Sequence, residues 1–470
     1  MRLLRTTTLL AAVAVGATLA GAATAAATPD LDWAQCGENA AVECATITVP
    51  IDWSRPHGDT IEVAVARRAV ENPIGTLFYL PGGPGDSGVR RLLDRDPLPD
   101  EIGSRFDVVS FDPRGTNRSA PVTCDAELVA NLPVTNPDAG ATLAGMRDYA
   151  RALGESCREH TGPLLDHLDS VSVARDVDAI RAALGERELS LYGRSYGTLA
   201  GAMYAERYPH RVRALVLDSV FDHSLSPRRF LWTQTATGED SFREFASWCD
   251  RAEECALHGQ DVDAVYDTLY AKSVAGELVD PTSGGPVRPM DLVNRTVSFF
   301  YGPSSAEAAV FLRSLADGAP AARVAAEETE PFPVAAFCAD HRVSIRSERQ
   351  WQRLWAQQNR AAPTLRTHFA WLPVTLCSAW PAETNNPQHR LDIDHTPVLV
   401  LNSAHDPATS IEWARNVTRQ IDHGRLLTYE GWGHGVVDRT PCTVEATTRY
   451  LVDLELPRRG ATCPADRSGG

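Results

Sequence analysis

The pentapeptide Gly193-Arg194-Ser195-Tyr196-Gly197 has the Gly-x-Ser-x-Gly pattern that surrounds a catalytic serine in many hydrolases. A short apolar run, residues 189–192, precedes it, and a segment with helical spacing, residues 198–208, follows it. Strand, tight turn and helix in this order form a nucleophile elbow, in which the serine hydroxyl projects above a sheet. Glycine on both sides of the serine lets strand and helix approach closely at the turn. The pattern and its flanks therefore predict Ser195 as a nucleophile.

A serine hydroxyl is a weak nucleophile at neutral pH, so it needs a base within reach and an acid that orients the base. When the serine sits on such an elbow, the acid and then the histidine follow it along the chain. Asp406 ends a turn after the apolar run 398–401, and His434 lies in a glycine-rich loop after the run 425–429. We therefore predict Asp406 as the acid and His434 as the base.

Other residues compete for these two roles. Asp218 ends the apolar run 214–217, which is where some hydrolases of this type carry their acid. His405 is adjacent to Asp406, and His423 precedes a strand rather than following one, so we expect both to be surface histidines. Asp218 remains the main alternative acid.

Two backbone amides are predicted to bind the oxyanion that forms when the serine attacks a carbonyl. One belongs to Tyr196, because the amide after the nucleophile commonly has this role. The other belongs to Gly83, in the loop Pro81-Gly82-Gly83-Pro84-Gly85-Asp86-Ser87-Gly88 that follows the run 76–80. So many glycines allow the backbone to approach a substrate closely. A phosphate-binding loop is the alternative, but neither Gly-Lys-Ser/Thr nor Gly-x-Gly-x-x-Gly occurs here.

Short, continuously apolar runs recur along the chain and are typical of buried parallel strands with functional loops at their carboxyl ends. They are residues 76–80, 108–111, 189–192, 214–217 and 398–401. Residues 45–51 and 61–68 are β-rich instead and predict an antiparallel pair at the edge of the sheet. Helical spacing at 172–184 and 198–208 completes the pattern. We predict an α/β-hydrolase fold, with a mostly parallel central sheet and helices on both faces.

The strand pattern stops after Asp218 and resumes only at Pro397. The interval is rich in tryptophan, phenylalanine and glutamate and has helical spacing at 240–250 and 304–315. We expect a mainly helical cap inserted into the sheet domain, because strands on both flanks then belong to one sheet; an independent domain is the alternative. The predicted parts are a signal peptide at 1–27, the α/β-hydrolase core at 28–219 and 393–470, and the cap at 220–392.

The first thirty residues have the features of an export signal. Arg2 and Arg5 precede an apolar run, residues 9–20, which small residues then follow. This order predicts a secretory signal peptide that is cleaved between Ala25 and Thr28, and a secreted, extracellular protein. A membrane anchor is the alternative, but it needs about 20 strongly apolar residues, and this run is shorter and rich in alanine.

Ten cysteines follow the signal peptide, and an even number in an exported chain indicates disulfides. The two shortest loops favour pairing in sequence order. The predicted pairs are Cys36 with Cys44, Cys124 with Cys157, Cys249 with Cys255, Cys338 with Cys377, and Cys442 with Cys463. Zinc is the alternative, but no Cys-x-x-Cys pair or His-x-x-x-His helix supplies ligands at short spacing.

The formal net charge of −16 leaves no extended basic field on the molecule. A phosphate backbone or an anionic membrane surface is held by such a field. We therefore expect no nucleic-acid partner and, after signal cleavage, no membrane partner; the sequence makes no prediction of the oligomeric state.

Several motifs in a fixed order together resemble one family. They are Gly82-Gly83-Pro84-Gly85, Asp112-Pro113-Arg114-Gly115, Gly193-Arg194-Ser195-Tyr196-Gly197-Thr198, Asp406-Pro407 and Gly433-His434-Gly435. From about Cys36 to Cys463 the chain resembles the prolyl-aminopeptidase-like α/β-hydrolases. It is more similar to their secreted branch, the tripeptidyl aminopeptidases of actinobacteria with a TAP-like C-terminal region. Prolyl aminopeptidases usually carry histidine where this chain has Pro81, a difference that favours the tripeptidyl branch over strict specificity for N-terminal proline.

The resemblance implies a serine exopeptidase that releases short peptides, tripeptides in the closer branch, from free N-termini through an acyl-enzyme. It places the triad on Ser195, Asp406 and His434 and the oxyanion hole on Gly83 and Tyr196. The implied partners are peptides with a free N-terminus, and the reaction requires neither a metal nor an organic cofactor. In this family the cap supplies carboxylates that bind the substrate ammonium. By location alone the candidates are Glu239, Asp240, Glu244 and Asp340; for each of them taken singly, a solvated helix face is the alternative and is favoured.

Two alternatives of different kinds remain open. An exported carboxylesterase or lipase would use the same triad, because fold and triad do not separate amide from ester hydrolysis. A binding protein without catalysis would keep the same scaffold, although all three triad residues are present in this chain. Epoxide hydrolases and dehalogenases are disfavoured, since both carry aspartate at the elbow and this chain has Ser195.

Overall fold

The computed structural model describes residues 31–302, 304–318 and 334–466, and the predicted signal peptide at 1–27 lies outside these residues. Within them, ten strands form one sheet in the order β1-β2-β3-β5-β4-β6-β7-β8-β9-β10. The strands are β1 (Ala34–Gln35), β2 (Val42–Pro50), β3 (Thr60–Arg68), β4 (Thr76–Leu80), β5 (Asp107–Phe111), β6 (Leu189–Arg194), β7 (Val212–Asp218), β8 (Val398–His405), β9 (Gly424–Trp432) and β10 (Ala461–Cys463).

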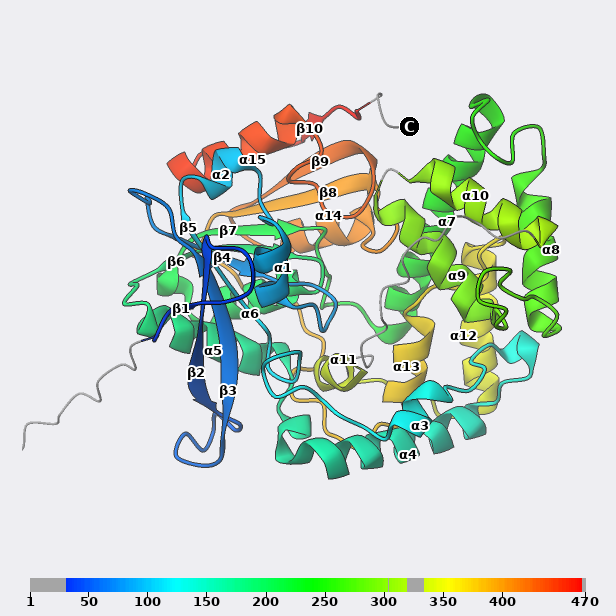
Figure 1. The fold of residues 1–470 in the computed structure, drawn as a ribbon, viewed down its shortest axis with the longest axis horizontal. Coiled ribbons are helices and arrows are strands. Elements are labelled where there is room, and N and C mark those ends of the chain that lie inside the picture. The colour runs from blue at the N-terminus through cyan, green and yellow to red at the C-terminus, as the bar shows by residue number, and fades with distance from the viewer. Residues whose placement is uncertain (1–30, 303, 319–333, 467–470) are drawn as a thin grey trace, which may run out of the picture.

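Helices surround this sheet and extend well beyond it on one side (Figure 1). The α-helices are α1 (Gly88–Asp94), α2 (Asp100–Gly103), α3 (Ala126–Ala130), α4 (Leu143–Thr161), α5 (Ser170–Ala183), α6 (Gly197–Arg207), α7 (Pro227–Arg251), α8 (Val262–Val274), α9 (Pro289–Ser298), α10 (Ser305–Asp317), α11 (Val334–Asp340), α12 (Glu348–Ala361), α13 (Trp371–Cys377), α14 (Ile411–Gln420) and α15 (Pro441–Asp453). Short 3₁₀ helices are η1 (Pro137–Ala139), η2 (Gly162–Asp166), η3 (Pro209–Arg211) and η4 (Phe299–Tyr301).

Strand pairing changes from antiparallel to parallel across the sheet. β2 pairs antiparallel with β1 and with β3, and β3 pairs antiparallel with β5. From β5 to β10 every neighbouring pair is parallel. The predicted antiparallel pair and the mostly parallel sheet are therefore confirmed. Because the strands from β4 to β10 run in one direction, the loops after β4, β6, β7, β8 and β9 emerge at the same edge of the sheet.

Two apolar layers, one on each face of the sheet, hold the core together. Along β7, Leu215 and Leu217 face the layer that contains α5, α6 and α14, whereas Ala214 and Val216 face the layer that contains α1, α2 and α15. Side chains alternate between the two faces of a strand, so a strand covered on both faces is apolar at most of its positions. This double burial explains the continuous apolar runs in the sequence.

A mainly helical cap, α7 to α13, lies between β7 and β8. These two strands pair parallel, so both flanks of this helical segment belong to one sheet. Part of the cap has an apolar core of its own, which includes Phe242 of α7, Tyr266 of α8, Leu292 of α9 and Leu312 of α10. In Figure 1 α8, α9 and α10 lie to the right, away from the sheet.

The long helix α4 lies between β5 and β6 and was not among the predicted elements. It contacts α12 and α13 of the cap. The backbone amide of Leu143, the first residue of α4, donates a hydrogen bond to Glu348 of α12, with N and Oε2 2.8 Å apart. Residues 28–219 therefore contribute a helix that supports the cap as well as the strands of the sheet.

All ten cysteines form disulfides within the described residues, and all five predicted pairs are confirmed. The bonds join Cys36 to Cys44, Cys124 to Cys157, Cys249 to Cys255, Cys338 to Cys377, and Cys442 to Cys463.

In the described part of the chain, no helix combines the length and the apolar character that a membrane span requires.

Arg114, from the motif Asp112-Pro113-Arg114-Gly115, has a structural role in the core. Its buried guanidinium forms two hydrogen bonds of 2.6 Å with the buried carboxylate of Asp176 on α5. It also donates to the backbone carbonyls of Pro50 and Ile51 at the end of β2. A buried charge must be paired and hydrogen-bonded to be tolerated. The arginine therefore joins the antiparallel edge of the sheet to the helix that precedes β6.

Candidate active site

Ser195 occupies a sharp turn between β6 and α6. Its φ angle is +56°, a left-handed conformation that non-glycine residues rarely adopt. A side chain at Gly197 would clash with the carbonyl oxygens of Leu80 and Pro81, so glycine is required there. Strand, strained serine and helix thus have the arrangement of a nucleophile elbow.

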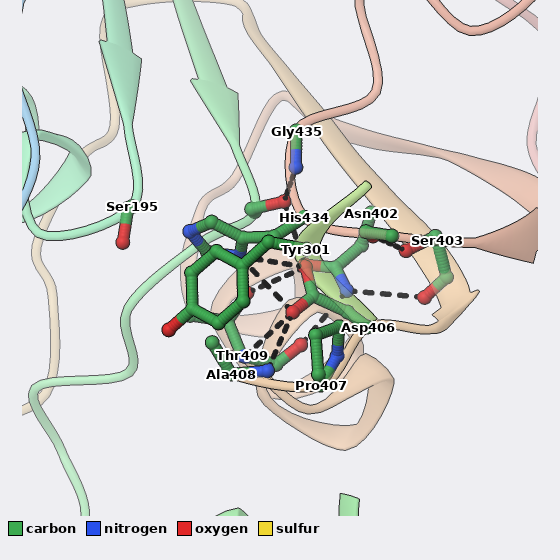
Figure 2. Close-up of polar contacts among 12 residues, drawn as sticks. Ser195, Tyr301, Asn402, Ser403, Asp406, Pro407, Ala408, Thr409, His434 and Gly435 are labelled. Carbon is green, nitrogen blue, oxygen red and sulfur yellow. Dashed lines mark hydrogen bonds and ion pairs between the residues drawn. The ribbon is translucent and has the colours of Figure 1, made fainter. Parts of the chain in front are cut away.

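His434 and Asp406 form a hydrogen-bonded pair beside this elbow. His434 Nδ1 lies 3.0 Å from Oδ1 and 3.1 Å from Oδ2 of Asp406, and both side chains are buried. Figure 2 shows the imidazole between Asp406 and the side where Ser195 lies, with no bond drawn to the serine. In the described residues no hydrogen bond joins Ser195 to His434. Such contacts are often long in a ligand-free enzyme and tighten when substrate binds.

The carboxylate of Asp406 is held by more than the histidine. Oδ1 accepts hydrogen bonds from the backbone amides of Ala408 and Thr409, both at 2.8 Å. Oδ2 accepts from the hydroxyls of Thr409, at 2.9 Å, and Ser219, at 2.8 Å. Burial by itself would raise the pKa of Asp406, but the interaction with His434 and these amide donors outweighs it and lowers the pKa. The group is therefore built to remain an anion.

Ser219, which sequence reasoning missed, links the acid to the histidine loop. It follows the last residue of β7, has a φ angle of +56° and is fully buried. Its hydroxyl donates to Asp406 Oδ2 and accepts the backbone N–H of Gly435 at 2.7 Å. One side chain thus fixes Asp406 relative to the residue after His434. A serine after a strand has no distinctive sequence signal, because only the folded chain brings residues 219, 406 and 435 together.

Replacing Ser219 by alanine is expected to lower kcat roughly 10- to 100-fold, because one hydrogen bond that positions Asp406, the predicted catalytic acid, is lost. KM should change little, since Ser219 lies behind Asp406 rather than on the substrate side. Steady-state hydrolysis and thermal melting of Ser219→Ala and Ser219→Gly check this. Glycine adopts the left-handed backbone conformation without strain but also lacks the hydroxyl, so both variants should lose kcat by a similar factor. Near-normal kcat in folded Ser219→Gly would show that the hydroxyl is not needed at this position.

Asp218, the alternative acid, does not contact His434. Its buried carboxylate accepts hydrogen bonds from the Tyr192 hydroxyl at 2.5 Å and from the backbone amides of Val436 and Val437 at 2.9 to 3.1 Å. Burial raises the pKa of Asp218. It anchors the chain just after the histidine and leaves the contact with the imidazole to Asp406.

Neither alternative histidine reaches Ser195. His405 Nδ1 is paired with Asp240 of α7 at 2.7 Å, and His405 is only partly exposed, unlike the surface position expected for it. His423 is exposed, as expected. Within the described ranges, no group of three or more histidine, cysteine, aspartate and glutamate side chains is arranged to hold a metal ion.

Tyr196, one of the two predicted oxyanion residues, directly follows the serine in the chain, and the loop that carries the other, Gly83, approaches the serine from a second side. Tyr196 is the N-cap residue of α6, so its amide lies at the helix terminus, where backbone N–H groups lack intrahelical acceptors. On the other side, the glycine-rich loop approaches the nucleophile most closely at Gly82, where a Cβ atom would lie 3.1 Å from Ser195 Cβ. Gly83 follows it, with a φ angle of +99°. The structure thus brings both loops to Ser195.

The four candidate ammonium-binding carboxylates fall into two pairs. Glu239 and Asp340 are buried and already saturated with donors: Glu239 binds Arg243 and two backbone amides, and Asp340 accepts four hydrogen bonds. Asp240 and Glu244, one turn apart on α7, are exposed and partly exposed. Asp240 contacts His405, and Glu244 accepts from the Trp432 indole N–H at 3.1 Å. This second pair therefore lies next to the loops that carry Asp406 and His434.

Comparison with known proteins identifies the family. Residues 75–281 match the model described as alpha/beta hydrolase fold, and residues 362–463 match the TAP-like protein model. The tripeptidyl aminopeptidase of Streptomyces lividans is 31% identical, over 94% of this chain and 88% of that protein. Serine protease Hip1 of Mycobacterium tuberculosis H37Rv is 30% identical, over 89% and 87%. Carboxylesterase B of the same organism is 29% identical, over 93% and 90%. The chain therefore belongs to the tripeptidyl aminopeptidase family of α/β-hydrolases, and it is a serine hydrolase.

Proposed function

We propose that this protein is a secreted exopeptidase that removes short peptides, three residues at a time, from free N-termini. The observation that carries the proposal is the buried His434–Asp406 pair beside the elbow of Ser195. The similarity to tripeptidyl aminopeptidases along 94% of the chain supports the choice of substrate. Relatives also include a protein named serine protease Hip1.

The proposed reaction begins when Ser195 Oγ attacks the carbonyl carbon of the scissile peptide bond. His434 Nε2 takes the serine proton, while Asp406 holds Nδ1–H and stabilises the imidazolium. The carbonyl electron pair moves to oxygen, where the amides of Gly83 and Tyr196 bind the oxyanion. Collapse of this intermediate breaks the C–N bond, and His434 protonates the leaving amine. Water, deprotonated by His434, then attacks the acyl-enzyme and releases the N-terminal peptide with a free carboxylate.

The substrate ammonium is proposed to bind at Asp240 and Glu244. Both carboxylates belong to α7 of the cap, and both contact the residues that lead into the catalytic loops, His405 and Trp432. Each retains solvent exposure, so an incoming ammonium reaches it. A charge-assisted hydrogen bond to a carboxylate is stronger than a neutral one. If the ammonium binds there, the position of α7 relative to Ser195 would set the number of residues removed.

Replacing Glu244 by glutamine is expected to raise KM for a free tripeptide p-nitroanilide roughly 10- to 100-fold, the effect of losing one hydrogen bond to a charged group. Glutamine still accepts from Trp432, so the fold of the site should persist. The matched control is Glu253→Gln, an exposed glutamate just after α7. Hydrolysis of amino-acyl, dipeptidyl and tripeptidyl anilides, each free and N-acetylated, checks both parts of the proposal.

We expect the wild-type enzyme to prefer the free tripeptide and to lose activity on the acetylated one. Equal cleavage of free and acetylated substrates by the wild type would overturn the exopeptidase assignment. An unchanged KM in Glu244→Gln, with the free tripeptide still preferred, would instead move the ammonium site away from α7. The first outcome would reject the proposed reaction, whereas the second would reject only the residues proposed to bind the substrate ammonium.

Carboxylesterase activity is the second candidate, because a relative named carboxylesterase B covers 93% of this chain at 29% identity. The same triad would attack an ester carbonyl. A p-nitrophenyl acyl ester in the substrate series distinguishes the two. Turnover of the ester alone would assign the protein to this class.

Export is proposed from two features. Residues 1–27 have the order of a signal peptide. All ten cysteines are paired in the described structure, and disulfides persist in oxidising compartments outside the cytosol. N-terminal sequencing of protein from the culture medium, beginning between residues 26 and 28, would test this.

A further inference from the structure

A hollow of about 330 Å³ lies at the edge of the sheet, where β9 and β10 meet the end of α14. Four arginines line it: Arg415 and Arg419 from α14, Arg425 from β9, and Arg459 from the turn before β10. The protein has a formal net charge of −16, yet four guanidinium groups concentrate positive charge at this hollow.

In the described parts of the chain, none of these arginines forms an ion pair. Arg419 donates to the amide oxygen of Asn416, and Arg425 donates to the carbonyl of Gly424. The nearest acidic residues in the sequence are also not paired with them. Glu412 of the same helix binds Arg229 of the cap instead. Asp422, Glu430 and Glu455 form no ion pair in the described structure.

Hydroxyl groups add neutral donors to the same hollow. Thr428 of β9 and Thr462 of β10 lie directly opposite each other in the parallel pair and both line it. Like charges at short range repel each other unless an anion lies between them. Guanidinium groups bind phosphate oxygens two at a time, and threonine hydroxyls donate to the remaining oxygens. The combination matches a compact ligand with several phosphate oxygens.

We propose that this hollow is a binding site for a soluble ligand that carries two or more linked phosphate groups. Four guanidinium charges offset the charge of a di- or triphosphate. The overall negative charge of the protein opposes approach to an anionic surface, which favours a free ligand over a lipid headgroup. This proposed binding site is additional to the proposed peptidase activity, and the observations that support it do not depend on that activity.

The arginine-lined hollow and His434 lie at opposite ends of strand β9. Arg425 is the second residue of β9, and His434 follows the last one. Eight to nine residues of extended strand span roughly 25–30 Å. A ligand in the hollow would therefore leave the active site open, and substitutions there should leave peptide hydrolysis unchanged.

The test is titration of the full-length secreted protein with sodium tripolyphosphate by isothermal calorimetry, at constant ionic strength. The site variant is Arg415→Gln/Arg419→Gln. The control is Arg349→Gln/Arg353→Gln, a second pair of exposed arginines one turn apart on a helix, here α12. We expect the wild type and the control to bind alike and the site variant to bind at least tenfold more weakly. Unchanged kcat/KM in both variants would show that they fold.

Three results would overturn the proposal. The first is no heat of binding above that of sodium chloride, and the second is equal weakening in both variants. The third is binding to phosphatidic acid vesicles without binding to tripolyphosphate, which would assign the site to a lipid headgroup. If the site variant fails to fold, Arg459→Gln, in the exposed turn before β10, tests the same hollow and should weaken binding severalfold.

Discussion

Replacing Ser195 by alanine is expected to lower kcat roughly 10⁴- to 10⁶-fold, which is the effect of removing a triad serine in enzymes of this mechanism. The left-handed turn presents this hydroxyl beside the His434–Asp406 pair. Ser219 also has a positive φ angle, but its hydroxyl is bonded to Asp406 and to the amide of Gly435. Residual turnover would come from binding and the oxyanion donors alone. Hydrolysis of a free tripeptide anilide measures the loss, and thermal melting shows whether the variant is folded.

Labelling with a fluorophosphonate probe gives an independent readout of the same residue. The wild type should be labelled, Ser195→Ala should not, and Ser344→Ala, which changes an exposed serine distant in sequence, should react like the wild type. Near-normal hydrolysis or labelling by folded Ser195→Ala would reject Ser195 as the nucleophile. Absence of labelling in the wild type would favour a binding protein that keeps the scaffold without catalysis.

Replacing Asp406 by asparagine is expected to lower kcat about 10⁴-fold, as loss of the triad carboxylate does elsewhere. The asparagine amide would present an N–H group to His434 Nδ1 and favour the tautomer with the proton on Nε2. That nitrogen could then no longer accept the serine proton. The pH profile of kcat between 5 and 9 measures the loss, and we expect it to persist throughout that range because the tautomer, rather than the charge of the acid, is wrong.

The matched comparison is Asp218→Asn, which changes another buried aspartate at the same edge of the sheet. Asp218 holds the amides of Val436 and Val437 rather than the imidazole. We expect a lower melting temperature and a much smaller loss of kcat for folded protein. If Asp218→Asn instead abolished turnover while Asp406→Asn remained active, the two acids would have to exchange roles.

The sheet could be predicted from the sequence because its strands are buried on both faces. β4 begins and ends at the residues expected from the apolar run 76–80, and β5, β6, β7 and β8 differ from prediction by only a few residues. The antiparallel pair β2 and β3 could be predicted from the sequence equally well. By contrast, β10 has three residues and no apolar run, and its place beside β9 depends on the Cys442–Cys463 disulfide and the rest of the fold.

Helix α4 shows a second limit of prediction from sequence, which concerns the partner that a helix packs against. Its buried residues include Met146, Ala150, Leu153 and Cys157, spaced by three or four positions, so a helical signal was present in the sequence. Its contacts with α12 and α13 are formed between segments about 200 residues apart. Periodicity indicates that one face of a helix is buried, but it does not say which element covers that face.

In the candidate site, too, some residues could be predicted from the sequence and others could not. Ser195, Asp406 and His434 each stand in a local motif with a characteristic flank, so sequence reasoning could name all three. Ser219 and the tyrosine of the cap, Tyr301, have no such motif. Tyr301 packs against His434 with ring centroids 4.9 Å apart and accepts the backbone N–H of His434 through its carbonyl. Residues of this kind are found only once the folded chain brings distant segments together.

The most direct test of the central claim is to trap the acyl-enzyme and locate it. The enzyme is mixed with the p-nitrophenyl ester of a tripeptide that has a free N-terminus, quenched in acid within the first turnovers and digested for mass spectrometry. We predict the mass of one tripeptidyl group on the peptide that contains Ser195, and a strongly reduced yield when the N-terminus is acetylated. An adduct on another residue, or no adduct despite turnover, would contradict the account.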